Sequence, residues 1–179
     1  MGNWISTNSF LLIRHKFVAI RVLFKFNIIQ IKNKLLRISI HVCYPAETAD
    51  VRLRVYGKSL KDLFKNSALA LFGLIIEYKP KPKKETEIKL EAQNQEELLV
   101  SWLNELISVF YTYKFLPANF KINIEDKGQF IALDAKIKGE DFNPYDNKKI
   151  NMEIKAATYY NLKIEKIKDG FRAEVVFDV

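Results

Sequence analysis

Cysteine and histidine are the scarcest reactive residues in this 179-residue chain. Cys43 is the only cysteine, so an intrachain disulfide, a thiolate zinc cluster and a CxxC redox motif are all excluded. A reducing compartment, and hence a cytoplasmic location, fits this composition. The only histidines, His15 and His41, precede the regularly patterned part of the chain. Their position argues against classical histidine-based catalysis.

The familiar catalytic and nucleotide-binding signatures are also missing. The sequence contains no GxxxxGK[ST] phosphate loop, no GxGxxG dinucleotide motif and no GxSxG nucleophile elbow. We therefore predict that the protein is not itself an enzyme.

Acidic residues are absent from the first 45 positions. This stretch holds seven Lys or Arg residues and no Asp or Glu, which leaves 22 basic and 21 acidic residues for the remainder. The net charge of +8 therefore belongs to the N-terminal part, and the body is close to neutral. Residues 1–38 form a basic, apolar N-terminal extension, and we expect a single domain to follow it.

Two interpretations of this extension stay open. Its charges interrupt the apolar run too often for a simple transmembrane helix, so we expect no firm membrane association. On a helix, Arg14, Arg21, Lys25 and Lys32 would form one stripe, as in a cationic helix at a membrane surface or in an RNA-binding module. Alternatively, the stretch is not native or is disordered, as an overlong start assignment would be.

From Val51 onward the chain alternates regular elements. Residues 51–56 have the period-two pattern of a half-buried strand, and Ser59 can cap a helix that ends near Tyr78. Residues 79–84 read KPKPKK, which is extended because of its prolines. We interpret this run as a solvated connector in preference to an RNA-contacting loop.

A second amphipathic helix and further strands complete the pattern. Asn94 and Glu97 resemble a capping box, and Trp102 lies on the broad apolar face of the helix that follows, which predicts a core position. Lys127-Gly128 and Asp169-Gly170 are the predicted hairpin turns. The fold class is therefore α+β, with a mostly antiparallel sheet of six or seven strands and two amphipathic helices on one face.

A conspicuous lysine lies in the segment EIKAATYY. Glu153 and Lys155 would share one side of a strand there, with Lys155 among apolar neighbours. The pair could be a buried ion pair, a functional ammonium with its partner, or a plain exposed pair.

Five segments in this order resemble the archease family: ETADVRLRVYGKSLKDLFKNSALALFGLI, LLVSWLNELI, IKGED, EIKAATYYNL and the closing VVFDV. The resemblance covers the body and assigns residues 39–179 to an archease-like domain. It implies an accessory protein that activates a GTP-dependent tRNA-splicing RNA ligase, promoting guanylylation and multiple turnover, with RNA involved only indirectly. An alternative that the resemblance also permits is a general chaperone or a modulator of a tRNA methyltransferase.

The resemblance also implies a divalent cation site formed by Asp50, Asp178 and the terminal Val179. Calcium is the leading candidate, with magnesium or manganese as alternatives, since hard cations take oxygen ligands. If Val51 and Phe177 point into the core, both aspartates point away from it. The family's functional lysine corresponds to Lys155, which could contact an acidic or phosphate-bearing partner.

Two positions depart from the family pattern. Glu47 stands where the family usually has histidine, and Tyr160 stands where histidine is also common. Glu47 could add an oxygen ligand and shift the metal preference toward harder ions, or it could be a turn carboxylate. Asp50 taken alone would read as a turn residue at a strand entry, and only the family match favours a ligand.

Overall fold

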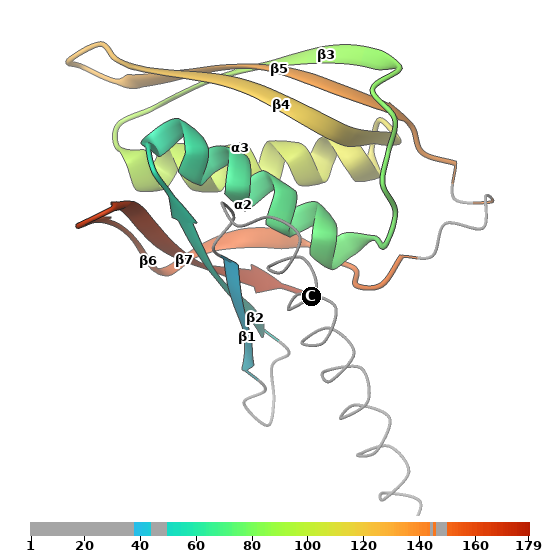
Figure 1. The fold of residues 1–179 in the computed structure, drawn as a ribbon, viewed down its shortest axis with the longest axis horizontal. Coiled ribbons are helices and arrows are strands. Elements are labelled where there is room, and N and C mark those ends of the chain that lie inside the picture. Colours follow the sequence, from blue (N-terminus) through green and yellow to red (C-terminus); the bar gives the residue numbers. More distant parts are fainter. Residues whose placement is uncertain (1–37, 44–49, 144, 146–149) are drawn as a thin grey trace, which may run out of the picture. The chain divides into compact units, whose positions relative to one another are not determined.

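The two helices are apolar around most of their circumference and need cover on two sides. The computed structural model describes residues 38–43, 50–143, 145 and 150–179. Within it, α2 (Leu60–Ile75) contacts strands of both sheets, and so does α3 (Gln95–Tyr111). The helices thus form a layer between two sheets, as Figure 1 shows. The buried residues of α2 are Leu63, Phe64, Asn66, Ser67, Ala68, Ala70, Leu71, Phe72, Leu74 and Ile75.

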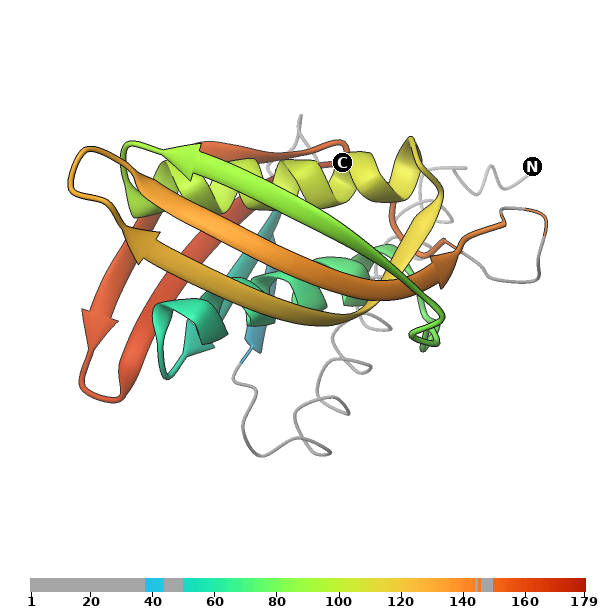
Figure 2. The ribbon, with the colours of Figure 1, turned by 90° about the horizontal axis from the view of Figure 1, so that it is seen from above.

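The strands pair antiparallel throughout. One sheet has the order β1-β2-β7-β6 and the other has the order β3-β5-β4. Figure 2 shows the second sheet from above, with the helices beneath it. The bounds are β1 (Ile38–Cys43), β2 (Asp50–Gly57), β3 (Lys84–Ala92), β4 (Phe115–Asp126), β5 (Ile131–Asp141), β6 (Ala156–Ile167) and β7 (Gly170–Asp178).

The predicted α+β class, with two helices and antiparallel strands, is confirmed. The expectation of one sheet covered on one face needs correction, because the strands divide into a four-stranded and a three-stranded sheet. Helices buried on opposite sides cannot be covered by a single sheet. All the described residues belong to one compact unit, Leu36–Val179.

The helix starts follow the predicted capping chemistry. The Asp62 backbone N–H donates to Ser59 Oγ, and the Asp62 carboxylate accepts from the Ser59 backbone N–H, which is a complete capping box. At α3, Asn94 accepts from the Glu97 backbone N–H, as predicted. The Glu97 carboxylate, however, accepts from the backbone N–H of Gln93, one residue before the cap.

Trp102 lies in the core, as its place on the apolar face predicts. Its side chain is fully buried, and Nε1 donates to the Phe64 carbonyl oxygen at 3.2 Å. Its ring meets Phe120 of β4 edge to face, with 6.0 Å between the centroids. The indole therefore joins both helices to the three-stranded sheet.

Gly170 turns the chain between β6 and β7 at the point where this hairpin meets the end of β2. Its φ of +132° disfavours any side chain, and a Cβ there would lie 2.1 Å from the Gly57 carbonyl oxygen. Gly128, in the β4–β5 hairpin, has a φ of +84° but open space around it. Both predicted hairpin turns are confirmed.

These two glycines predict different costs of substitution. Gly128→Ala should lower the free energy of unfolding by about 1–2 kcal/mol through backbone strain alone. Gly170→Ala should cost clearly more, because the backbone of Gly57 must also move. Urea denaturation of both variants measures the difference. Equal losses would show that the contact with Gly57 carries no energetic weight.

One buried carboxylate anchors the connector before β3. Glu140 on β5 is only 4% exposed, and its Oε2 accepts from Lys83 Nζ at 2.9 Å. This hydrogen bond lowers the pKa of Glu140 to about 2. The backbone N–H of Lys83 also donates to the Gly139 carbonyl oxygen. The connector is therefore tied to the sheet edge through Lys83.

The ion pair predicts a defined pH dependence. A depressed carboxyl pKa stabilises the fold fully above the ordinary carboxyl range, and the gain is lost as the pH falls toward 2. Glu140→Gln should therefore be destabilised at pH 7, with a gap to wild type that narrows at pH 3. Urea denaturation at both pH values measures this gap. Glu85→Gln, in an exposed pair with Lys138, should change little at either pH.

The extension and its two interpretations lie outside the described residues, apart from Ile38. Within the part of the chain that the structure describes, no helix has both the length and the apolar character needed to cross a membrane.

Candidate functional site

The pairing of β2 with β7 places Asp50 directly opposite Asp178. Asp50 is the first residue of β2 and Asp178 is the last of β7, and the antiparallel register makes them cross-strand partners. Figure 1 shows the two strands side by side, with the C-terminus at this end of the sheet. Two carboxylates far apart in sequence therefore occupy neighbouring positions.

Both aspartates belong to the outer face of the four-stranded sheet. Their inward neighbours Val51 and Phe177 are buried, at 1% and 0% exposure. Because successive strand residues point to opposite faces, Asp50 and Asp178 point away from the core. Asp178 is exposed and Asp50 is half-buried. The predicted alternation around the two aspartates is confirmed.

Lys155 reaches the same end of the sheet from the segment before β6. Its backbone N–H donates to the Asp178 carbonyl oxygen at 2.9 Å, and its Nζ donates to a Val179 oxygen at 3.0 Å. Asp50, Lys155, Asp178 and Val179 thus gather at one place, which we call the carboxylate row. Glu47 lies outside the described residues.

The strand predicted to contain Glu153 and Lys155 begins only at Ala156, after both residues. Residues 150–155 form no strand with β7, because the Asn151 N–H donates to the Ile75 carbonyl oxygen and the Ile154 N–H donates to the Tyr111 hydroxyl. Glu153 and Lys155 are both exposed on either side of the buried Ile154. The buried-pair interpretation is therefore wrong.

Charge in the carboxylate row is largely uncompensated. Like charges directly opposite each other on neighbouring strands destabilise the pairing. Among the described residues, neither Asp50 nor Asp178 has a side-chain hydrogen bond or ion pair. The same residues include no group of three His, Cys, Asp or Glu side chains able to hold a metal. A cation here would depend on the two aspartates and the chain-terminal carboxylate, a set of oxygen donors that suits a hard cation.

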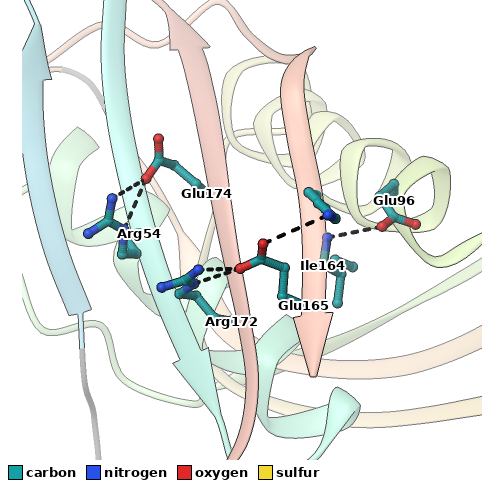
Figure 3. A network of polar contacts seen from close by, with 7 residues as sticks. Arg54, Glu96, Ile164, Glu165, Arg172 and Glu174 are labelled. Carbon is teal, nitrogen blue, oxygen red and sulfur yellow. Dashed lines mark hydrogen bonds and ion pairs between the residues drawn. The ribbon is translucent and has the colours of Figure 1, made fainter. Parts of the chain in front are cut away.

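Several charged residues elsewhere on this sheet face, on β2, β7 and β6, form ion pairs. Glu174 accepts from Arg54 Nη2 at 2.7 Å and lies 3.2 Å from Arg52 Nη1. Arg172 donates to Glu165, and this hydrogen bond lowers the pKa of the Glu165 carboxyl group. Figure 3 shows these pairs running across the strands. The carboxylate row differs from these pairs because Asp50 and Asp178 form no ion pair with another described residue.

Side chains of α3 cover the edge strand beside the row, a feature that sequence reasoning missed. Asn104 exchanges two hydrogen bonds with the Ala157 backbone, at 2.8 and 3.1 Å. Glu96 accepts from the Ile164 N–H, as Figure 3 shows. These contacts occupy backbone groups that could otherwise pair with another chain. Only the tertiary arrangement reveals them.

Between these two contacts β6 bulges. The register with β7 shifts between Thr158 and Lys163, and Asn161 has a φ of +51°. The side chains of Tyr159 and Tyr160 at the bulge are 61% and 62% exposed. Asn161 offered the one sequence signal for this bulge, because asparagine tolerates positive φ better than most residues.

Comparison with known proteins identifies relatives that match the described domain. Residues 43–179 match the model of the Archease protein family. The protein archease of Methanosarcina acetivorans is 36% identical over 139 residues, which cover 76% of this chain and 94% of that protein. The protein archease of Pyrococcus furiosus is 37% identical over 134 residues, covering 74% and 94%. This chain therefore belongs to the Archease protein family.

A solved structure supports the fold. The solution structure of Methanobacterium thermoautotrophicum protein 1598 superposes with a TM-score of 0.68, covering 79% of this chain and 98% of that one. The two sequences are 24% identical, so this likeness concerns the fold alone.

The opposed carboxylates predict an effect on stability in the absence of metal. With a chelator present, Asp50→Asn should raise the free energy of unfolding by about 0.5 kcal/mol, because it removes the repulsion from Asp178. Urea denaturation measures this gain. Glu91→Gln, an exposed carboxylate opposite Ala132 on the other sheet, is the matched control and should change nothing. A lower free energy of unfolding in Asp50→Asn would show that repulsion between Asp50 and Asp178 does not destabilise the fold.

Proposed function

We propose that this protein activates a GTP-dependent RNA ligase that joins tRNA exon halves in the cytoplasm, promoting guanylylation and multiple turnover. It does not join RNA itself. Membership of the Archease protein family supports this assignment through the resemblance described above. The observation that carries it is the carboxylate row, where Asp50, Asp178 and Val179 meet at an exposed end of the sheet.

The row is suited to binding a divalent cation. Asp50 and Asp178 supply side-chain carboxylates from neighbouring strands, and Val179 supplies the terminal carboxylate. Calcium is our first choice, with magnesium or manganese as alternatives, because all three accept oxygen ligands. A bound cation would supply positive charge that offsets the carboxylate repulsion and attracts anionic groups of a partner. Lys155 positions the chain terminus through its hydrogen bond to Val179.

The chemistry of the domain supports an accessory role. Residues 50–179 contain neither histidine, the commonest general base of enzymes, nor cysteine, a strong nucleophile. The only histidine and cysteine of the domain, His41 and Cys43, belong to β1. The carboxylate row, with the Lys155 ammonium beside it, is better suited to docking on another protein's active site than to catalysis of its own. Lys155 is placed to contact an acidic or phosphate-bearing group of that partner.

Stimulation of a purified ligase tests the proposal. Adding the wild-type protein should accelerate guanylylation of the ligase by GTP, and Asp50→Ala and Asp178→Ala should reduce the rate to that of the ligase alone. Glu91→Ala, which removes an exposed carboxylate from the other sheet, should stimulate like wild type. Normal stimulation by both aspartate variants would refute a role for the row. Suppression of methyltransferase aggregation without ligase stimulation would favour the chaperone alternative.

Cation binding has its own readout. Calcium at about 100 times its dissociation constant should raise the melting temperature of the wild type by about 5 °C or more. The Asp50→Ala and Asp178→Ala variants should show no such rise, whereas Glu91→Ala should match wild type. No rise for the wild type with any of the three cations would remove the metal from the proposal.

A further inference from the structure

The outer face of the three-stranded sheet, on the side of the helices away from the carboxylate row, carries charged residues of both signs. Figures 1 and 2 show this sheet, β3-β5-β4, as a separate layer. Ile88, Ala135 and Phe120 are buried against the helices, so the residues that alternate with them face outward. Those outward residues are mostly charged.

An open hollow of about 570 Å³ lies on this face. Four lysines are among the residues that line it, Lys61, Lys89, Lys121 and Lys136, and we call it the lysine hollow. The acidic residues in the lining are Glu87 and Asp134. Four positive and two negative groups leave a formal surplus of two positive charges.

Much of this positive charge has no carboxylate partner. Lys136 pairs with Glu87 at 3.0 Å, but Lys61 donates at 2.6 Å to the neutral side chain of Asn123. Lys89 lies opposite Asp134 in the β3–β5 register, and Lys121 is in no ion pair within the described ranges of the chain. The surplus of two positive charges therefore falls on Lys61 and Lys121.

The arrangement costs stability in two places. Lys121 lies directly opposite Lys136 in the β4–β5 register, and like charges opposite each other destabilise a strand pair. Lys61 is the second residue of α2, where the positive end of the helix dipole disfavours a cation. An anion in the hollow would relieve both repulsions.

The lysines at the other end of the same sheet are arranged differently. Lys83 pairs with Glu140, Lys84 with Asp141, and Lys138 with Glu85. Two lysines of the connector at residues 79–84, which we interpreted as solvated in preference to RNA-contacting, are thus neutralised by carboxylates. The surplus positive charge lies at the middle of the strands instead.

We propose that the lysine hollow binds the sugar–phosphate backbone of RNA. Its lysines come from three strands and the first turn of α2, and neighbouring strands are about 4.8 Å apart, so the charges are spread over several phosphate positions. None of the lining residues is aromatic, so contact would be made through phosphates without base stacking. The choice of RNA rests on the proposed function, in which the partner ligase acts on tRNA halves.

The test compares two charge-matched variants of the full chain. One carries Lys89→Gln and Lys121→Gln; the control carries Lys65→Gln and Lys168→Gln, which remove exposed lysines from α2 and the β6–β7 hairpin. Both keep the basic extension, so any binding by that segment contributes equally. Fluorescence anisotropy with a short labelled single-stranded RNA of mixed sequence, over a range of salt concentrations, measures affinity.

The hollow variant should bind RNA roughly tenfold more weakly than wild type, and the control should bind like wild type. The slope of log affinity against log salt should become shallower by about 1.4, because each lost phosphate contact contributes about 0.7 for a single strand. Unchanged affinity and slope in the hollow variant, or an equal loss in the control, would overturn the proposal.

Guanylylation separates this inference from the ligase proposal, because that step proceeds without RNA. The hollow variant should stimulate guanylylation normally while binding RNA weakly, and Asp50→Ala should bind RNA normally. If the hollow variant instead loses stimulation and keeps its affinity for RNA, this face contacts the ligase protein and the RNA proposal is wrong. Matching thermal melts of both variants exclude unfolding as the cause of any difference.

Discussion

The fold depends on covering two helices that are apolar on opposite sides. α2 buries both Leu63 and Phe72, which are nine residues apart and therefore on opposite sides of the helix, so no single surface can cover it. A sheet on each side solves this problem, and Trp102 of α3 links the layers by contacting Phe120. Each sheet is left with one face toward solvent, and these two outer faces carry the surface chemistry of the protein.

The carboxylate row and the lysine hollow differ in the sign of their surplus charge. On the four-stranded sheet Arg54 and Arg172 are paired with glutamates, whereas Asp50 and Asp178 are in no ion pair with another described residue. In the lysine hollow four lysines face two carboxylates, with Lys89 and Lys121 on the strands that flank β5. Under the two proposals above, the protein would contact two ligands from opposite sides, a cation at the carboxylate row and an anion at the lysine hollow.

The carboxylate row shows why long-range pairing matters for a site. Asp50 and Asp178 come together because β2 and β7 pair, which joins the early and late parts of the domain. The alternation of buried and exposed residues around each aspartate indicated which face of the sheet it occupies. It did not indicate which strand lies beside it. Lys155 joins the row through the backbone bond to Asp178, in a segment that pattern reasoning had placed within a strand.

Local chemistry was enough to predict most elements of this protein, although not β1. The caps at Ser59 and Asn94, the hairpin glycines and the alternating strands depend on neighbouring residues, so the sequence alone predicted them. The family resemblance added the roles of the conspicuous charges. Only the tertiary structure decided that the strands divide into two sheets, that Asn104 covers the β6 edge, and that lysines from four elements meet in one hollow. Those features depend on which distant segments pack together, and the pattern along one strand or helix does not specify its neighbours.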